Sequence, residues 1–185
     1  MSTVEANIRI ENVVASASLD QKFDLNAIVK GYPGVEYRPK KFPGLVFRIR
    51  KPKTAILIFS TGKMVCTGAK SEKESIKAVN KVIRELKKSG IIIPGKPEIK
   101  IVNMVASGNL SGSIELEEAT YSLGKTMYEP EQFPGLVYKL IEPNATFLLF
   151  SNGKLVCTGT KNNQQLNDSM EQLIAHLKEA QANIK

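Results

Sequence analysis

The chain repeats itself once, at a fixed offset of 91 residues. About 30 of about 90 aligned positions are identical, which chance does not produce in a single register. Three motifs carry the repeat: residues 12–16, 42–46 and 59–70 return as residues 103–107, 133–137 and 150–161. A period this long that occurs only twice is not a solenoid. The sequence therefore predicts a duplicated α+β subdomain with pseudo-two-fold symmetry, residues 1–94 forming the first repeat and residues 95–185 the second.

Composition excludes several classes of function. Residues 1–94 hold 18 Lys and Arg against 8 Asp and Glu, and residues 95–185 hold 8 against 10. The net charge of +8 permits a polyanionic partner without requiring one. No apolar run approaches the ~20 residues of a membrane span, and the N-terminus has no signal-peptide pattern, so we expect no membrane partner. Two cysteines, one histidine and no catalytic triad or carboxylate pair predict neither an enzyme nor a cofactor or metal site.

Local patterns predict the elements of the first repeat, which the second repeats. Strands are expected at residues 8–16, 45–50, 54–59 and 63–68, a short helix at 24–30, and a long helix after a capping box that begins at Ser71. The apolar face of that helix is Ile76, Val79, Val82, Ile83 and Leu86, and its basic face is Lys73, Lys77, Lys81, Arg84, Lys87 and Lys88. The second long helix packs through Leu166, Met170, Leu173, Ile174 and Leu177. Strands plus one long helix per repeat predict an antiparallel sheet with helices on one face.

The other face of this sheet is also apolar. Strand alternation places Met64 and Cys66 on one face and Val65 and Thr67 on the opposite face. We expect Cys66, like its counterpart Cys157, to be a buried small apolar residue that faces the helices. Because the helices cover only one face, a broad apolar surface is left for a dimer partner, a second sheet or a ligand.

Four phenylalanines and two asparagines are the candidate binding residues. Phe42, Phe59, Phe133 and Phe150 adjoin glycine turns, so they are either core residues or apolar wedges at the sheet edge. Asn12 and Asn103 interrupt apolar strands at equivalent positions. Each is either an internally satisfied amide or a reader of base edges, because an amide both donates and accepts hydrogen bonds.

Cations recur at equivalent places around the predicted strands of both repeats. They are Lys63, Lys70 and Arg48 in the first repeat and Lys154, Lys161 and Lys139 in the second. They form either a solvated surface or two clamps for phosphate groups. His176 adjoins an apolar helix stripe, and we expect it at the surface or at the boundary of the core.

At these motifs the sequence resembles the TATA-box-binding protein family over about residues 5–180. The resemblance is carried by residues 12–16, 37–39, 42–46, 52–54, 62–70 and 128–138. It implies a saddle: a ten-stranded antiparallel sheet whose concave face binds the DNA minor groove, with four helices on the convex face. It also implies a general transcription initiation factor that binds and bends TATA-box promoter DNA, and it implies no cofactor.

The resemblance assigns a role to each candidate residue. The intercalating pairs would be Phe42 with Phe59 and Phe133 with Phe150. Minor-groove contacts would come from Asn12, Val14, Leu57, Val65, Thr67, Asn103, Val105, Leu148, Val156 and Thr158. Phosphate contacts would come from Arg48, Arg50, Lys63, Lys70, Lys139, Lys154 and Lys161. A transcription factor B-type protein would dock on Glu129, Glu131 and Gln132, and RNA polymerase would follow.

Several features of the sequence allow more than one interpretation. Residues 37–41 form a basic loop where members of the family often have an acidic one, so a matching acidic contact through the first repeat is in doubt. The basic helix 71–89 is either a solvated face or a contact for an acidic partner or flanking DNA. The free protein could also form a homodimer. The short N-terminus favours an archaeal, cytoplasmic protein over a nuclear, eukaryotic one. The alternative function is a saddle-fold interaction or accessory domain whose apolar face binds a protein.

Overall fold

The computed structural model describes residues 6–182, with side chains described through Ala180. In chain order its elements are β1 (Ala6–Ser18), α1 (Leu25–Gly31), β2 (Glu36–Tyr37), β3 (Leu45–Ile49), β4 (Thr54–Ile58), β5 (Lys63–Ala69), α2 (Glu72–Lys88), β6 (Glu98–Leu110), α3 (Leu116–Ser122), β7 (Thr126–Met127), β8 (Leu136–Leu140), β9 (Ala145–Leu149), β10 (Lys154–Thr160) and α4 (Asn163–Ala182). The predicted elements are all present, with ends that shift by up to three residues. The two-residue strands β2 and β7 have no counterpart among them.

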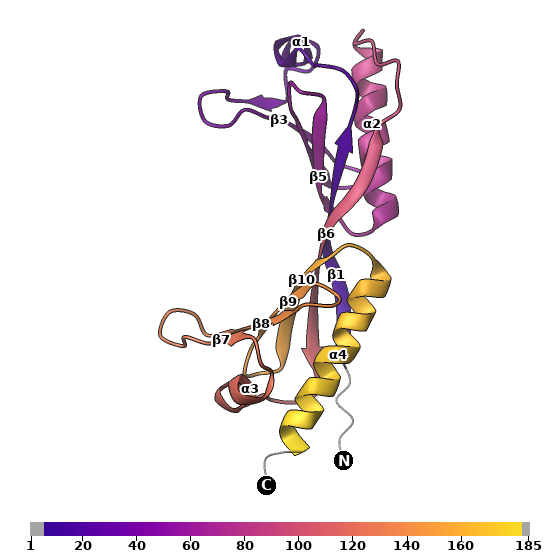
Figure 1. Cartoon of the computed structure of the whole chain (residues 1–185). Coiled ribbons are helices and arrows are strands. Elements are labelled where there is room, and N and C mark those ends of the chain that lie inside the picture. The colour runs from indigo at the N-terminus through magenta and orange to yellow at the C-terminus, as the bar shows by residue number, and fades with distance from the viewer. Residues whose placement is uncertain (1–5, 183–185) are drawn as a thin grey trace. The chain divides into compact units, whose positions relative to one another are not determined.

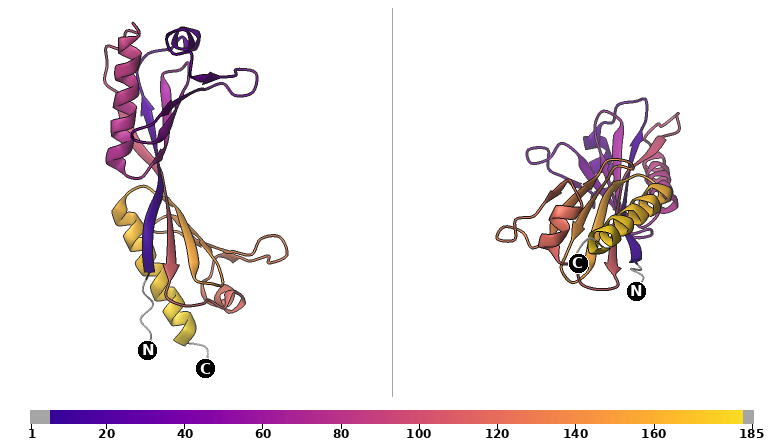
Figure 2. Two further views of the ribbon diagram at one scale, coloured as in Figure 1. Left: turned by 180° about the vertical axis from the view of Figure 1, so that it is seen from behind. Right: turned by 60° about the horizontal axis from the view of Figure 1, so that its bottom comes forward.

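The ten strands form one sheet in the order β2-β3-β4-β5-β1-β6-β10-β9-β8-β7. The sequence β7 to β10 repeats β2 to β5, as a duplication requires. In each repeat, the long helix lies on one side of the strands and the loop after the two-residue strand extends on the other (Figure 1; Figure 2). The predicted α+β fold, with a ten-stranded antiparallel sheet and four helices, is confirmed.

The chain folds as two compact units. The N-terminal unit is Asn12–Val102, and the C-terminal unit combines the chain before Asn12 with the chain after Val102. This division differs from the predicted repeats 1–94 and 95–185 because β1 and β6 each begin in one unit and end in the other. The repeat boundaries themselves stay a prediction.

The two long strands change the parity of their buried positions as they pass from one unit to the other. In β1, Ile8 and Ile10 pack against the C-terminal core, whereas Ala15 and Ala17 are in the N-terminal core. The even positions are thus buried first and the odd positions afterwards. The same change occurs in β6, where Ile99 and Ile101 pack against the N-terminal core and Ala106 and Leu110 belong to the C-terminal core. Strict alternation is therefore interrupted in the middle of each strand.

Capping side chains start the helices of the N-terminal unit. Asp24 Oδ1 accepts the backbone N–H groups of Asn26 and Ala27, which begins α1. Ser71 Oγ accepts the N–H of Glu74 at 3.1 Å, as the capping box predicts. The Glu74 carboxylate reaches one residue further than that motif requires and accepts the Lys70 N–H at 2.8 Å.

One predicted core position on α2 is wrong. Ile76 is 37% exposed, whereas Val79, Val82 and Leu86 are fully buried. Ser75 takes the buried position in the first turn, because its hydroxyl is satisfied by donating to the Glu72 carbonyl at 2.7 Å. The apolar stripe predicted for α4 is confirmed. Leu166, Met170, Leu173 and Leu177 are buried, and Ile174 packs against the core and is partly buried.

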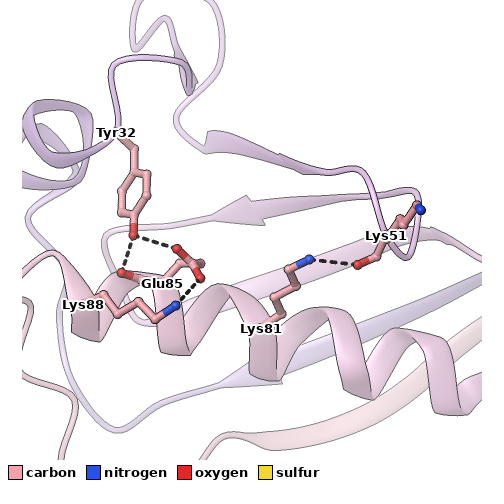
Figure 3. A network of polar contacts seen from close by, with 5 residues as sticks. All are labelled: Tyr32, Lys51, Lys81, Glu85 and Lys88. Atoms are coloured by element: carbon pink, nitrogen blue, oxygen red, sulfur yellow. Dashed lines mark hydrogen bonds and ion pairs between the residues drawn. The ribbon is translucent and has the colours of Figure 1, made fainter.

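Side chains of α2 tie this helix to the loops that carry Tyr32 and Lys51 (Figure 3). The Tyr32 hydroxyl donates to the backbone carbonyl and the carboxylate of Glu85, and Lys88 Nζ lies 3.0 Å from the same carboxylate. The hydrogen bond from Lys88 lowers the pKa of Glu85. Lys81 Nζ donates to the Lys51 carbonyl at 3.0 Å. Two of the six predicted basic residues of this helix therefore have partners within the chain.

The two cysteines are inert core residues. Both are fully buried, as predicted, and burial raises the pKa of the Cys66 thiol to about 11 and that of Cys157 to about 12. At pH 8 about one thiol in a thousand or fewer is therefore ionised, so neither is a ready nucleophile. His176 is half-buried, at the core boundary as predicted, with Nδ1 2.7 Å from the Tyr138 hydroxyl.

Thr160 offers a test of packing in the C-terminal unit. Its hydroxyl is buried and has no hydrogen-bond partner in the described part of the chain, and the equivalent residue of the first repeat is Ala69. We expect Thr160→Val to raise the free energy of unfolding by about 1 kcal/mol, because the change removes an unsatisfied hydroxyl and keeps the shape. Urea denaturation measures it. Thr54→Val is the matched control and should lose stability, since Thr54 Oγ1 donates to the Pro52 carbonyl at 3.2 Å. Equal losses in both variants would show that Thr160 has a partner.

Candidate nucleic-acid interface

Each unit has a sheet face that none of its described helices covers, named here the open face. In the N-terminal unit a row of paired residues crosses it: Val46, Leu57, Val65 and Ser16. The C-terminal unit has the equivalent row Val137, Leu148, Val156 and Ser107. All eight residues are half-buried, and they alternate along their strands with residues in the two cores. The predicted second apolar face is therefore present in both units.

Asn12 is fixed on the open face by a backbone hydrogen bond. The Gly68 N–H donates to Asn12 Oδ1 at 2.7 Å, and Asn12 Nδ2 donates to Thr67 Oγ1 at 3.1 Å. Because a backbone N–H can only donate, the amide oxygen must face Gly68 and the NH₂ group must face the other way. Gly68 has a φ of 95°, a conformation that other residues rarely adopt.

Asn103 repeats this arrangement in the C-terminal unit. The Gly159 N–H donates to Asn103 Oδ1 at 2.8 Å, and Asn103 Nδ2 donates to Thr158 Oγ1 at 3.1 Å. Gly159 has a φ of 98°. Each amide oxygen is therefore satisfied internally, and each amide NH₂ group donates to a threonine hydroxyl beside it on the apolar face. That the asparagines read base edges stays a prediction.

The four phenylalanines form two ring pairs. Phe42 and Phe59 have ring centroids 5.8 Å apart at 70°, and Phe133 and Phe150 have centroids 5.9 Å apart at 69°. A Cβ on Gly44 would lie 2.6 Å from the Phe42 ring, so the glycine of each Phe-Pro-Gly motif lets the rings sit over the backbone. Phe42 is 39% exposed and Phe133 is 42% exposed. None of the four rings belongs to either core cluster, and the wedge role stays a prediction.

The seven predicted phosphate-contact residues are all exposed: Arg48, Arg50, Lys63, Lys70, Lys139, Lys154 and Lys161. Lys63, Phe59 and Val65 line a hollow of about 530 Å³, and Lys154, Phe150 and Val156 line its counterpart of about 710 Å³. A cation therefore stands beside each ring pair.

Arg48 also has a partner within the N-terminal unit. Its Nη2 is 3.8 Å from Glu36, which Arg38 approaches to 3.7 Å. Such long, exposed ion pairs contribute little to stability and leave Arg48 able to exchange Glu36 for another anion.

The loops that follow β2 and β7 have the same backbone and opposite charge. The N–H groups of Lys41 and Phe42 both donate to the Arg38 carbonyl, and those of Gln132 and Phe133 both donate to the Glu129 carbonyl. Glu129, Glu131 and Gln132 are exposed, and the two carboxylates form no ion pair with any residue between 6 and 182. A free acidic surface in this position would repel phosphate groups.

Several open-face residues are absent from the predicted contacts. Ser16 and Val46 are among them, although alternation with buried neighbours and identity with Ser107 and Val137 could have identified them. Two further cations line the hollows beside the ring pairs: Lys100 in the N-terminal unit and Arg9 in the C-terminal unit. Arg9 belongs to the first repeat but lies in the C-terminal unit, and Lys100 belongs to the second repeat but lies in the N-terminal unit. Alignment of the two repeats therefore does not show which hollow each residue lines.

Comparison with known proteins identifies the family of this chain. The family model described as "Transcription factor TFIID (or TATA-binding protein, TBP)" matches residues 7–89 and 98–180. The chain belongs to the TATA-binding protein family. It is 49% identical over 173 residues to the TATA-box-binding protein of Pyrodictium occultum, covering 94% of this chain and 87% of that protein. It is 49% identical over 175 residues to the TATA-box-binding protein of Sulfolobus acidocaldarius, covering 95% and 89%.

A solved structure of this family shares the fold. The Methanococcus jannaschii TBP superposes with a TM-score of 0.86 and 43% identity, covering 94% of this chain and 99% of that one. TATA-binding proteins are transcription factors, so the prediction that the chain is not an enzyme is confirmed. Among the described residues no group of three His, Cys, Asp or Glu side chains could hold a metal ion. None of the described helices is long and apolar enough to cross a membrane.

Proposed function

We propose that the chain is a general transcription initiation factor that binds TATA-box promoter DNA through the minor groove, using the open face of each unit. The apolar open face, with amide NH₂ groups as its fixed donors, supports this most directly. The minor groove of an A·T pair presents only acceptors, adenine N3 and thymine O2. A G·C pair adds the guanine amino group, which an apolar surface would bury without a partner. The relatives from Pyrodictium and Sulfolobus carry the name TATA-box-binding protein.

The asparagines are the proposed base readers. The Gly68 and Gly159 N–H groups hold the amide oxygens, so the NH₂ groups are oriented before DNA arrives. The neighbouring hydroxyls of Thr67 and Thr158 can rotate to donate or accept. The proposed apolar contacts with base and sugar edges are Val14, Leu57 and Val65 in the first repeat and Val105, Leu148 and Val156 in the second.

The ring pairs are the proposed wedges. Apolar side chains inserted between base steps unstack the DNA and kink it toward the major groove, a mode for which TATA-binding proteins are themselves a described example. Phe42 and Phe133 are the exposed rings of the two pairs, Phe59 and Phe150 are half-buried beside them, and a glycine packs closely against the rings of each pair. We propose that both pairs bend the DNA in this way.

The exposed cations beside the open faces are the proposed phosphate contacts. They are Arg48, Arg50, Lys63, Lys70, Lys139, Lys154 and Lys161.

The acidic loop is the proposed docking site for a transcription factor B-type protein, through Glu129, Glu131 and Gln132, and that protein would bring RNA polymerase. Without DNA, a second copy could cover the same apolar face, so homodimerisation remains part of the proposal.

The wedges are tested by removing a ring. Phe59→Ala or Phe150→Ala should weaken binding to a TATA duplex by about 1–3 kcal/mol, the usual worth of aromatic–base stacking, and should reduce the bend. Energy transfer between dyes at the duplex ends measures the bend. Tyr121→Ala is the control, because Tyr121 is 90% exposed on α3 and should leave both quantities unchanged. An unchanged bend in both phenylalanine variants would favour a protein-binding function for the open face.

Salt dependence separates the open face from α2. Lys63→Ala and Lys154→Ala should each make the fall of log affinity with log salt shallower, by about one unit of slope or less, because each removes one phosphate contact. Lys77→Ala and Lys87→Ala on α2 are better controls than Lys81→Ala, since Lys81 has a partner in the chain. An equal drop in the α2 variants would show that the basic helix follows the DNA backbone.

The acidic loop should act on protein rather than DNA. Glu129→Arg combined with Glu131→Arg should leave TATA binding intact or slightly tighter, because a local repulsion of phosphate is removed. The same double variant should abolish assembly of the B-type factor on the DNA complex, where like charges would now meet. Gel-shift assays with and without that factor measure both effects. The opposite reversal, Arg38→Glu with Lys40→Glu, should weaken DNA binding instead. A normal ternary complex of the first variant would place the factor elsewhere.

A further inference from the structure

The proposed base-contacting residues are the same in both repeats. Asn12, Val14, Leu57, Val65 and Thr67 correspond to Asn103, Val105, Leu148, Val156 and Thr158. Identical side chains at equivalent positions read the two halves of a DNA site alike. Such a surface cannot distinguish a duplex from the same duplex turned end to end. A preferred orientation that is read from the base pairs must therefore come from open-face positions at which the repeats differ.

Glu11 and Val102 are such a pair of positions. Glu11 directly precedes Asn12 in β1, and Val102 directly precedes Asn103 in β6. Because Ile10 packs against the C-terminal core, alternation places Glu11 on the open face of that unit. Ile101 packs against the N-terminal core in the same way, which places Val102 on the other open face, 43% exposed. One repeat thus has a carboxylate where the other has an apolar side chain.

The Glu11 carboxylate is held in place within the C-terminal unit. Arg9 Nη2 lies 2.8 Å from Glu11 Oε1, and the Ser107 hydroxyl donates to the same oxygen at 2.7 Å. The Arg9 side chain is 81% exposed and that of Glu11 is 31% exposed. The guanidinium therefore offsets the negative charge at the surface while the serine fixes the carboxylate on the face.

An ionised carboxylate is a pure hydrogen-bond acceptor for about four donors. Arg9 Nε and Nη2 and the Ser107 hydroxyl all meet Glu11 at Oε1, so a donor from DNA would add to these contacts or replace the exposed Arg9. The minor-groove edge of an A·T pair offers it no donor, whereas guanine N2 is a donor on that edge. Beside Val102 the same amino group would be buried unpaired, at a cost. Glu11 and Val102 should therefore treat a G·C pair in opposite ways.

We propose that Glu11 is a specificity-determining residue that accepts a hydrogen bond from guanine N2. It makes the half of the site that it contacts tolerant of one G·C pair and so orients the protein on DNA. This inference rests on the proposed minor-groove binding. It adds to that function an asymmetry that the shared base-contacting residues cannot supply.

A self-complementary parent duplex tests this without knowledge of the binding orientation. Its core is TATATATA, and a G·C pair is placed at each position of one half in turn, either singly or together with its symmetric mate. With one G·C pair, the protein can bind in the orientation that brings the pair to Glu11. With two symmetric pairs, one must always face Val102. Inosine in place of guanine is the matched control, because it removes only the amino group.

At one position or more, a single G·C pair should weaken wild-type binding about twofold and the symmetric double by about tenfold or more, well above the roughly fourfold that the square of the single cost would give. Glu11→Val should raise the cost of the single pair to about tenfold at that position. Val102→Glu should lower the cost of the double pair to about threefold, and this gain of tolerance also serves if Glu11→Val fails to fold. Inosine pairs should abolish all these differences.

The inference is overturned if the double substitution costs only the square of the single one at every position, or if neither variant changes these ratios. It is also overturned if inosine and guanine behave alike. These failures are distinct from failure of the proposed function, which would appear as wild-type protein that binds the parent core no more tightly than a wholly G·C core.

Discussion

Side chains along a β-strand alternate between two faces, and in this chain both faces are apolar. One set of residues, such as Ile56, Ile58 and Cys66, is covered by helices and forms the core. The other set, such as Leu57 and Val65, is left half-buried on the open face. Because the same short strands supply both sets, the surface that is free to bind cannot move without the core that supports it. The proposed contact with DNA depends on this rigidity.

Glycine at positive φ makes the polar part of that surface possible. The backbone turns at Gly68 and Gly159, and the N–H group presented there holds an asparagine from the neighbouring strand. Two amides are thereby oriented on an otherwise apolar face with no partner present. Binding then requires little reordering of the side chains, which favours affinity for any surface that offers acceptors at the right places. The minor groove of A·T pairs is such a surface.

Much of the fold could be predicted from the sequence, because the repeat is strong and its strands alternate clearly. The hairpins, the cap at Ser71, the inward cysteines and the uncovered face all followed from local patterns. Ile76 did not, because helical spacing alone cannot show that Ser75 satisfies its hydroxyl and takes the buried position. The placement of Arg9 and Lys100 also needed the structure, since their strands cross from one unit to the other. The roles of the site residues in binding stay predictions, supported by position, exposure and family.

The groove that the open face reads is the central claim, and base analogues test it directly. An I·C pair has the minor-groove acceptors of A·T and the major-groove edge of G·C. Affinity should be measured for three duplexes of equal length whose cores contain A·T, I·C or G·C pairs throughout. The open-face account predicts that the I·C core binds within about threefold of the A·T core and that the G·C core binds weaker by about tenfold or more. An I·C core that binds as weakly as the G·C core would show that the protein reads the major groove and would contradict the account.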